Sequence, residues 1–323
     1  MVRFLAEVLS WDSQSKITKK YLTLMILKRY KLKLYLYQKL FLPNCKMKNQ
    51  TLIFLFCFLA SLIKSQKIEF NGEIPMRFFS FSGETLDKSQ QNIYYEFSFI
   101  KRSKSKIQTI CILELGKSKS KFSDLNSIKS DSLTKIYNTQ KRVTNEEFNK
   151  LFQMRGKWNN VLIKDRDNKT IIVQDRVLNA YQYDEKQPDF NWKLETETKI
   201  ILGYNCNRAT TQYRGRKYVA WYTTGIPISN GPYVFEGLPG LIMEIEDSKD
   251  EFHFKAVAMD KIPREIYRRN DKEIRIVTRE QFRKLAKDYH ENPGYYLGET
   301  YDAAGNQIRD RGKSIPYNPI EKE

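Results

Sequence analysis

The amino-acid sequence predicts a mainly β or α+β fold, in which an antiparallel, curved β-sheet carries about two short helices. Two observations predict the sheet. Over residues 94–99 the side chains alternate, with Tyr95, Phe97 and Phe99 on one side, and this period of two is typical of a half-buried strand. Other short segments are rich in β-branched or aromatic residues. These further predicted strands are 67–70, 77–81, 107–115, 160–165 and 169–174.

Two helices interrupt this pattern, and each begins with a capping box. Thr144 starts the sequence Thr-Asn-Glu-Glu, and Thr278 starts Thr-Arg-Glu-Gln. In the second helix Phe282, Leu285 and Tyr289 share one face, and the Asn-Pro-Gly sequence that follows ends the helix. By contrast, residues 116–135 are rich in Ser and Lys without periodicity, which predicts a long exposed loop.

The sequence of residues 191–258 predicts successive pairs of antiparallel β-strands. Two strands, roughly 191–206 and 209–223, form a ribbon, and two more, starting at Leu241 and Phe252, form a hairpin. Between them, Pro and Gly break residues 225–240 into short pieces that cannot form a regular helix or a central strand. We expect this segment to form the rim of a groove, with a type II turn at Leu238-Pro239-Gly240-Leu241.

The sequence predicts one targeting segment, within the first 65 residues. Residues 47–65 combine Lys48, an apolar run from Leu52 to Ile63 and small or polar residues near Ser65, which predicts a secretory signal peptide cleaved after Ser65. An uncleaved anchor is the alternative. Residues 1–46 are then interpreted as an upstream translation artefact or a disordered extension, or else as a basic membrane-surface arm. We expect residues 66–323 to form a single β-rich domain.

This division changes the interpretation of charge. The 323-residue chain has a formal net charge of +18, from 56 Lys and Arg against 38 Asp and Glu. Residues 1–65 hold 12 of these basic and 2 of these acidic residues, which leaves 44 and 36 in residues 66–323, a net charge of +8. A mildly basic exported chain does not require a nucleic-acid partner.

Two cysteines remain in the predicted domain, Cys111 and Cys206. An exported protein meets an oxidising compartment, so the two can form a disulfide. One pair at this separation does not define a disulfide framework, and two buried free thiols are the alternative.

Residues 237–242 form a distinctive signature, and they follow Trp221-Tyr222, Ile226-Pro227 and Gly231-Pro232. In these residues, in 203–206 and in the tail 318–321, the chain resembles the GLPGLI family, a group of exported proteins of Bacteroidota. The resemblance is specific over about 70 residues. It implies a signal peptide and an antiparallel β-rich fold, but no reaction, because the family is functionally uncharacterised. We expect the signature to form a turn made of Gly237, Leu238, Pro239, Gly240, Leu241 and Ile242.

Motifs for catalysis, metal binding or cofactor binding are missing from the sequence. It contains no HExxH, CxxC or GxSxG motif, so we predict no catalytic residues, no metal and no cofactor. The best candidate ligand surface is a basic and aromatic cluster, suited to an anionic ligand or a lipid headgroup. A charged hairpin tip is the alternative interpretation of the same cluster. Its residues are Arg208, Arg214, Arg216, Lys217, Trp221 and Tyr222.

These observations favour an exported periplasmic or envelope-associated protein, with secretion into the medium as a further possibility. The leading hypothesis is a non-catalytic binding or accessory protein whose partner is an envelope lipid, a glycan or an outer-membrane protein. One alternative is an envelope hydrolase that uses carboxylates, with Glu236, Glu244 and Glu246 as candidates. A structural surface protein is the second alternative.

Overall fold

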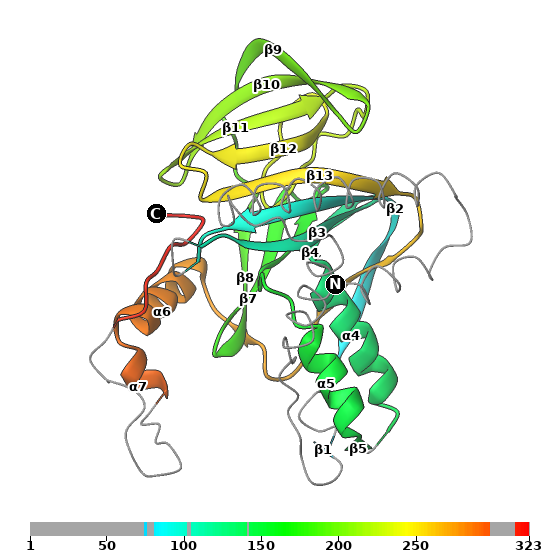
Figure 1. Cartoon of the computed structure of the whole chain (residues 1–323), viewed down its shortest axis with the longest axis vertical. Helices are drawn as coiled ribbons and strands as arrows, with labels where there is room; N and C mark the ends of the chain where they lie inside the picture. The colour runs from blue at the N-terminus through cyan, green and yellow to red at the C-terminus, as the bar shows by residue number, and fades with distance from the viewer. Residues whose placement is uncertain (1–73, 76–80, 102–104, 141, 298–313, 323) are drawn as a thin grey trace, which may run out of the picture. The chain divides into compact units, whose positions relative to one another are not determined.

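The described residues all lie within the range 66–323, for which a β-rich domain is predicted (Figure 1). The signal peptide predicted at 47–65, the 46 residues before it and the strands predicted at 67–70 and 77–81 lie outside the described residues, apart from Phe81. Within the described residues, every helix is too short or too polar to span a lipid bilayer. The computed structural model describes residues 74–75, 81–101, 105–140, 142–297 and 314–322.

Among the described residues, thirteen strands form one sheet, which confirms the predicted fold class. Two antiparallel meanders, β2-β3-β4-β6-β7-β8 and β13-β12-β11-β10-β9, join where β13 pairs with β2 (Figure 1). A separate two-stranded sheet pairs β1 with β5, while β14 pairs with β2 and β15 runs parallel to β8. The strands are β1 (Ile74–Pro75), β2 (Gly83–Phe99), β3 (Ile107–Gly116), β4 (Lys119–Asp124), β5 (Arg142–Val143), β6 (Val161–Asp165), β7 (Thr170–Val177), β8 (Asn179–Lys186), β9 (Lys193–Ile201), β10 (Tyr204–Tyr213), β11 (Arg216–Thr223), β12 (Leu241–Asp247), β13 (Phe252–Asp260), β14 (Glu265–Arg269) and β15 (Arg275–Ile276).

The aromatic alternation in β2 places the core where the two meanders meet. Tyr95, Phe97 and Phe99 are buried, and the ring of Phe97 stacks on Phe254 of β13 with a centroid distance of 4.0 Å. Phe97 also stands opposite Phe254 in the strand register. The period of two therefore determined both the strand and its buried face.

The hairpin predicted at 160–165 and 169–174 is confirmed as β6 and β7. The ribbon predicted at 191–223 is wrong in its strand count, because three strands, β9, β10 and β11, occupy it. Leu202-Gly203 and Arg214-Gly215 connect them, and all four residues have positive φ. Two consecutive residues with positive φ form the tight turn that matches the twist of a hairpin. The X-Gly dipeptides are the signal that was missed.

Both capping boxes are confirmed, at Thr144 before α5 (Asn145–Gln153) and at Thr278 before α6 (Arg279–Glu291). A short helix, α7 (Pro293–Leu297), follows α6. The predicted loop at 116–135 is wrong: it contains β4 and most of α4 (Leu125–Tyr137). Asp124 caps α4 through the amide of Asn126, a signal that the run of Ser and Lys obscured.

The segment 225–240 packs inside the fold and does not form the predicted rim. Tyr233, Val234, Phe235 and Leu238 are buried, and the fully buried Lys164 of β6 donates to the carbonyls of Gly231 (3.2 Å) and Phe235 (3.0 Å). Lys164 also lies 3.7 Å from the carboxylate of Glu236. Burial lowers the pKa of Lys164 to about 8. We call residues 225–242 the plug; this range is the segment 225–240 together with the first two residues of β12.

The turn in the plug also differs from the prediction. The amide of Gly240 donates to the carbonyl of Leu238 (2.7 Å), while the amide of Leu241 donates to Ile226 (3.0 Å). The turn at Pro239 is therefore a three-residue γ-type turn, and the type II prediction is wrong. Gly240 has a φ of 153°, and a Cβ there would lie 2.0 Å from the carbonyl oxygen of Thr223. Only glycine fits at this position.

The two ends of the signature lie outside this turn, so its six residues do not form one turn as expected. Gly237 has a φ of 90°, and its amide donates to the hydroxyl of Ser229 (3.0 Å). Ile242 belongs to β12 together with Leu241, and its side chain is fully buried. The carbonyl of Ile242 accepts from the hydroxyl of Tyr95 (2.7 Å), which ties the end of the signature to β2.

Cys111 on β3 and Cys206 on β10 are both buried free thiols. The structure therefore contains the second of the two alternatives, and the disulfide is not formed. Burial raises the pKa of both thiols, so both are protonated at neutral pH.

Candidate functional site

Two adjoining hollows lie beside α6 and the C-terminal tail, residues 314–322. The inner one, the aromatic cavity, has a volume of about 520 Å³. It lies between the end of β2, strand β7, helix α6 and the tail, and aromatic rings form most of its apolar wall. These rings belong to Phe99, Trp158, Tyr183, Tyr233, Phe252, Phe282, Tyr289 and Tyr317.

Two acidic residues line the aromatic cavity, Asp175 of β7 and Glu321 of the tail. Asn160 donates to Oδ2 of Asp175 (2.6 Å), and the amide of Arg176 donates to its Oδ1 (2.6 Å). Burial of the carboxyl group raises the pKa of Asp175 to about 6, against the lowering effect of these two donors. Asp175 therefore changes charge near neutral pH. The indole Nε1 of Trp158, in the same wall, is buried without a hydrogen-bond partner.

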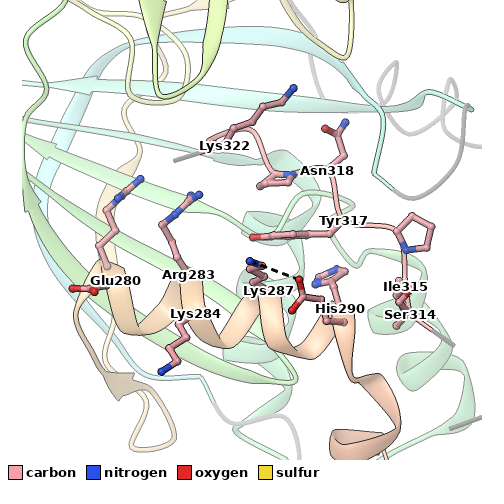
Figure 2. A pocket seen from close by; sticks show the side chains of 14 residues that line it. Glu280, Arg283, Lys284, Lys287, His290, Ser314, Ile315, Tyr317, Asn318 and Lys322 are labelled. Atoms are coloured by element: carbon pink, nitrogen blue, oxygen red, sulfur yellow. Dashed lines mark ion pairs between the residues drawn. The ribbon is translucent and has the colours of Figure 1, made fainter. Parts of the chain in front are cut away.

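The outer hollow, the basic groove, has a volume of about 930 Å³ and runs along α6 beneath the tail (Figure 2). Figure 2 shows the ring of Tyr317 lying across the groove, and this ring stacks on His290 at a centroid distance of 4.4 Å. Lysines and arginines in the groove outnumber its two acidic residues, Glu280 and Glu291. The basic residues are Arg279, Arg283, Lys284, Lys287 and Lys322.

The tail separates the two hollows, because Tyr317, Asn318 and Pro319 line both. Glu321 fixes the tail: its buried carboxylate accepts hydrogen bonds from Arg214 (2.7 Å), Arg279 (2.6 Å) and the hydroxyl of Tyr233 (2.7 Å). Burial alone would raise the pKa of Glu321, but Arg214 and Arg279 hold it below its usual value. The carboxylate is thus ionised at neutral pH.

The six residues of the predicted ligand surface do not lie on one exposed face. Arg216 is buried (3 % exposed) and pairs with Asp247 at 3.0 Å, and Tyr222 is buried (5 % exposed). Arg214 pairs with Glu321, and Arg208 pairs with Glu195 and Glu197 on the neighbouring strand β9.

The two remaining members of that surface, Lys217 and Trp221, lie on β11. Lys217 is exposed, whereas Trp221 is partly buried beneath the ammonium group of Lys199, 4.3 Å from the ring centroid. A cation already covers the face of this indole ring. The basic residues that line the basic groove lie mainly on α6 instead.

Two of the three carboxylates considered for a hydrolase, Glu244 and Glu246 of β12, lie near the ring of His253 (2.9 and 3.9 Å), and the third, Glu236, belongs to the plug. Glu236 lies beside Lys164, while Glu244 accepts from His253 (2.9 Å) and pairs with Lys199 (2.7 Å). Burial would raise the pKa of Glu244, but His253 and Lys199 lower it to about 2, so it cannot act as an acid near neutral pH. These contacts stabilise the sheet.

One group of three side chains among the described residues has the spacing of metal ligands, namely Glu246, Asp250 and His253 on the β12–β13 hairpin. Asp250 already forms an ion pair with Lys106, and His253 Nε2 lies 2.9 Å from Glu244. Both would have to exchange a partner to bind an ion, so the geometry is that of a charged hairpin.

Sequence reasoning missed the aromatic cavity and the basic groove. Their residues come from β2, β7, α6 and the tail, which are distant in sequence, and no local motif joins them. The two available signals were the strongly basic face of the predicted helix after Thr278 and the tail sequence 318–321.

A model of a family described as "Protein of unknown function (Porph_ging)" matches residues 211–244, which run from the end of β10 into β12 and include the plug. A search of curated proteins found no match. Among solved structures, the chain is similar to two crystal forms of PNGF-II, in space groups P21 and C2.

Both PNGF-II structures align with a TM-score of 0.42 and 17 % sequence identity, over 64 % of this chain and 34 % of that one. This chain thus spans about a third of PNGF-II. At that score the alignment supports no argument about activity, and the family model, which matches residues 211–244, describes a family of unknown function.

Proposed function

We propose that this chain is an exported, non-catalytic binding protein of the cell envelope, of the GLPGLI type, which holds an amphipathic ligand with an anionic group. One observation carries the proposal: the aromatic cavity and the basic groove adjoin beside α6. Export rests on the signal peptide predicted at 47–65. The family assignment rests on the residues at 237–242, within the matched range 211–244.

Basic side chains line both hollows, in the cavity Lys101, Arg155, Arg176 and Arg283, but the cavity adds many aromatic rings. Aromatic rings in the cavity give a large apolar area and stacking faces, as in most small-molecule sites. The groove offers the ammonium groups of Lys284 and Lys287 on α6, and that of Lys287 lies 3.7 Å from the carboxylate of Glu291 (Figure 2). A molecule with an apolar part and a negatively charged headgroup can use both at once. An anionic envelope lipid fits this description better than a neutral glycan does.

The test is a fluorescence titration with 8-anilinonaphthalene-1-sulfonate, which has an aromatic body and one sulfonate. We expect saturable binding that weakens about tenfold when Lys284 and Lys287 are both changed to Glu, a loss of about 1.4 kcal/mol. The matched control is Lys272→Glu, an exposed lysine between β14 and β15, which should leave the affinity unchanged. Equal affinities in the two variants would contradict the proposal.

One observation favours a second function, an envelope hydrolase. The pKa of Asp175, raised by burial to about 6, is suited to a general acid or base, and the residue lines the aromatic cavity. If the chain is a hydrolase, Asp175→Asn should abolish turnover in a screen of ester, glycoside and amide substrates without changing the circular dichroism spectrum. Asp167→Asn, in an exposed turn, is the control. A screen without turnover by the unaltered chain counts against this function.

A further inference from the structure

Residues 318–321 each contact side chains of the domain. We call the set of these side chains the slot, and it consists of Arg214, Arg216, Tyr218, Tyr233, Arg279 and Arg283. Asn318 accepts from Arg216 (2.7 Å) and donates to the carbonyl of Ile100 (2.8 Å). The carbonyl of Pro319 also accepts from Arg216 (2.8 Å), and the carbonyl of Ile320 accepts from Tyr218 (3.2 Å). The segment belongs to no helix or strand, so side chains of the domain hold it.

The far end of the segment is held just as closely. The side chain of Ile320 is buried, and Glu321 accepts from Arg214, Arg279 and Tyr233 as described above. Arg283 donates to the backbone carbonyl of Glu321 (2.9 Å). The slot therefore binds an apolar side chain, that of Ile320, followed by a carboxylate, that of Glu321.

Three of the four arginines that hold the tail, Arg214, Arg216 and Arg279, also contact carboxylates of the domain outside the tail. Arg216 is held by Asp247 (3.0 Å) and Glu251 (2.5 Å), so its other amino group faces Asn318 and Pro319. Glu185 of β8 likewise holds Arg214 (2.6 Å).

Glu185 also lies 3.5 Å from Arg279, so one carboxylate of β8 supports two of the arginines that bind Glu321. Guanidinium groups held in this way form a preorganised carboxylate site, which loses little entropy when a carboxylate enters. Glu185 can therefore keep both arginines in place when the tail leaves the slot.

We propose that this slot is a peptide-recognition site for the sequence Asn-Pro-Ile-Glu, and that the partner it fits is the tail of a second copy of the chain. The chain's own tail is the resident occupant, and another copy presents the same residues. Sixteen residues separate Leu297 from Ser314, and a segment of this length spans at most about 55 Å when extended, which limits how far the tail can reach towards a second copy. This proposal does not depend on the ligand of the aromatic cavity.

The test uses the full chain with Glu321→Gln, which weakens its own tail, and a fluorescein-labelled peptide of residues 314–323. Fluorescence anisotropy should show saturable binding of this peptide to the variant. A peptide with Gln in place of Glu321 should bind at least about tenfold more weakly, because it lacks the charge-assisted hydrogen bonds to the arginines.

A second variant, Asn318→Ala, loosens the other end of the tail and keeps the result interpretable if Glu321→Gln fails to fold. Lys322→Ala is the matched control, because Lys322 contacts the domain through its backbone amide (2.9 Å to the carbonyl of Arg214). In this variant the chain's own tail stays in the slot. The variant should therefore bind the peptide no better than the unaltered chain. If Glu321→Gln or Asn318→Ala is folded by circular dichroism and no folded variant binds the wild-type peptide, the proposal is overturned.

Discussion

The plug and the tail are two irregular segments that the same sheet holds in opposite ways. The plug, at residues 225–242, is buried by apolar side chains, and one lysine, Lys164, binds its carbonyls. The tail, at residues 314–322, is held by arginines at Glu321 and has a hollow on each side. A buried apolar segment is fixed by packing, whereas a segment held by ion pairs can exchange its partner for another anion.

This difference separates the recognisable sequence from the candidate site. Residues 237–242 are the most distinctive in the chain, yet their geometry serves packing, since Gly240 lies against the backbone at Thr223 and Ile242 is fully buried. The open surface, the raised pKa and the unpartnered indole N–H all lie near the tail. The distinctive motif therefore serves the fold, and the features that support the proposed function lie near the tail.

Gly240→Ala should have the largest effect, because the new Cβ would meet the carbonyl oxygen of Thr223 at 2.0 Å and the φ of 153° disfavours alanine. We expect the free energy of unfolding in urea to fall by about 4 kcal/mol. Gly203→Ala is the control, since it also has a positive φ but no atom within 4 Å of the new Cβ. It should cost about 1 kcal/mol. Equal losses would mean that the plug is not closely packed.

Lys164→Met tests the polar anchor of the plug. The variant leaves the buried carbonyls of Gly231 and Phe235 without a donor, and the free energy of unfolding should fall by about 3 kcal/mol. Lys186→Met, at the exposed end of β8, should change it by less than about 0.5 kcal/mol. A small effect at Lys164 would show that the apolar contacts alone hold the plug.

Glu321→Gln tests the tail and should cost about 2 kcal/mol near pH 7, less than the plug variants. The pKa of Glu321 is lowered in the folded state, so its contribution is present above the unfolded pKa of about 4.5 and is lost as pH falls through the folded pKa. Urea titrations of both chains should therefore converge at acidic pH. Glu280→Gln, exposed on α6, should show no such pH dependence.

Asp175→Asn should have the smallest effect and the opposite sign. The pKa of Asp175 is raised to about 6 in the folded state, so above that pH the wild-type chain buries a charge that the variant lacks. The variant should be more stable by about 1 kcal/mol at pH 7, and the difference should vanish below about pH 3, where both states are protonated. Asp167→Asn is the control. A destabilised Asp175→Asn variant would contradict the raised pKa.

The sequence was sufficient to predict the sheet, because a period of two and a capping box are local signals. The burial of Phe97 and the helix starts at Thr144 and Thr278 were predicted in this way. Helix α4 was missed because its residues are polar and its cap, Asp124, carries the main signal. Local patterns predict an element only when its own residues carry the period.

The candidate site could not be predicted in the same way. Arg214 and Arg216 were chosen for their charge, but their carboxylate partners, Glu321 and Asp247, lie 107 and 31 residues away. Sequence does not show which charges are neutralised by folding. The elevated pKa of Asp175 likewise depends on burial among side chains from distant elements.

The most direct test of the account is hydrogen–deuterium exchange of the full chain with and without 8-anilinonaphthalene-1-sulfonate. The probe should slow exchange in α6 and in residues 314–322, and it should leave the amides of the plug unchanged apart from those near Tyr233, whose ring lines the aromatic cavity. Protection confined to residues 225–242, with none in α6 or the tail, would contradict the claim that the tail region is the functional site.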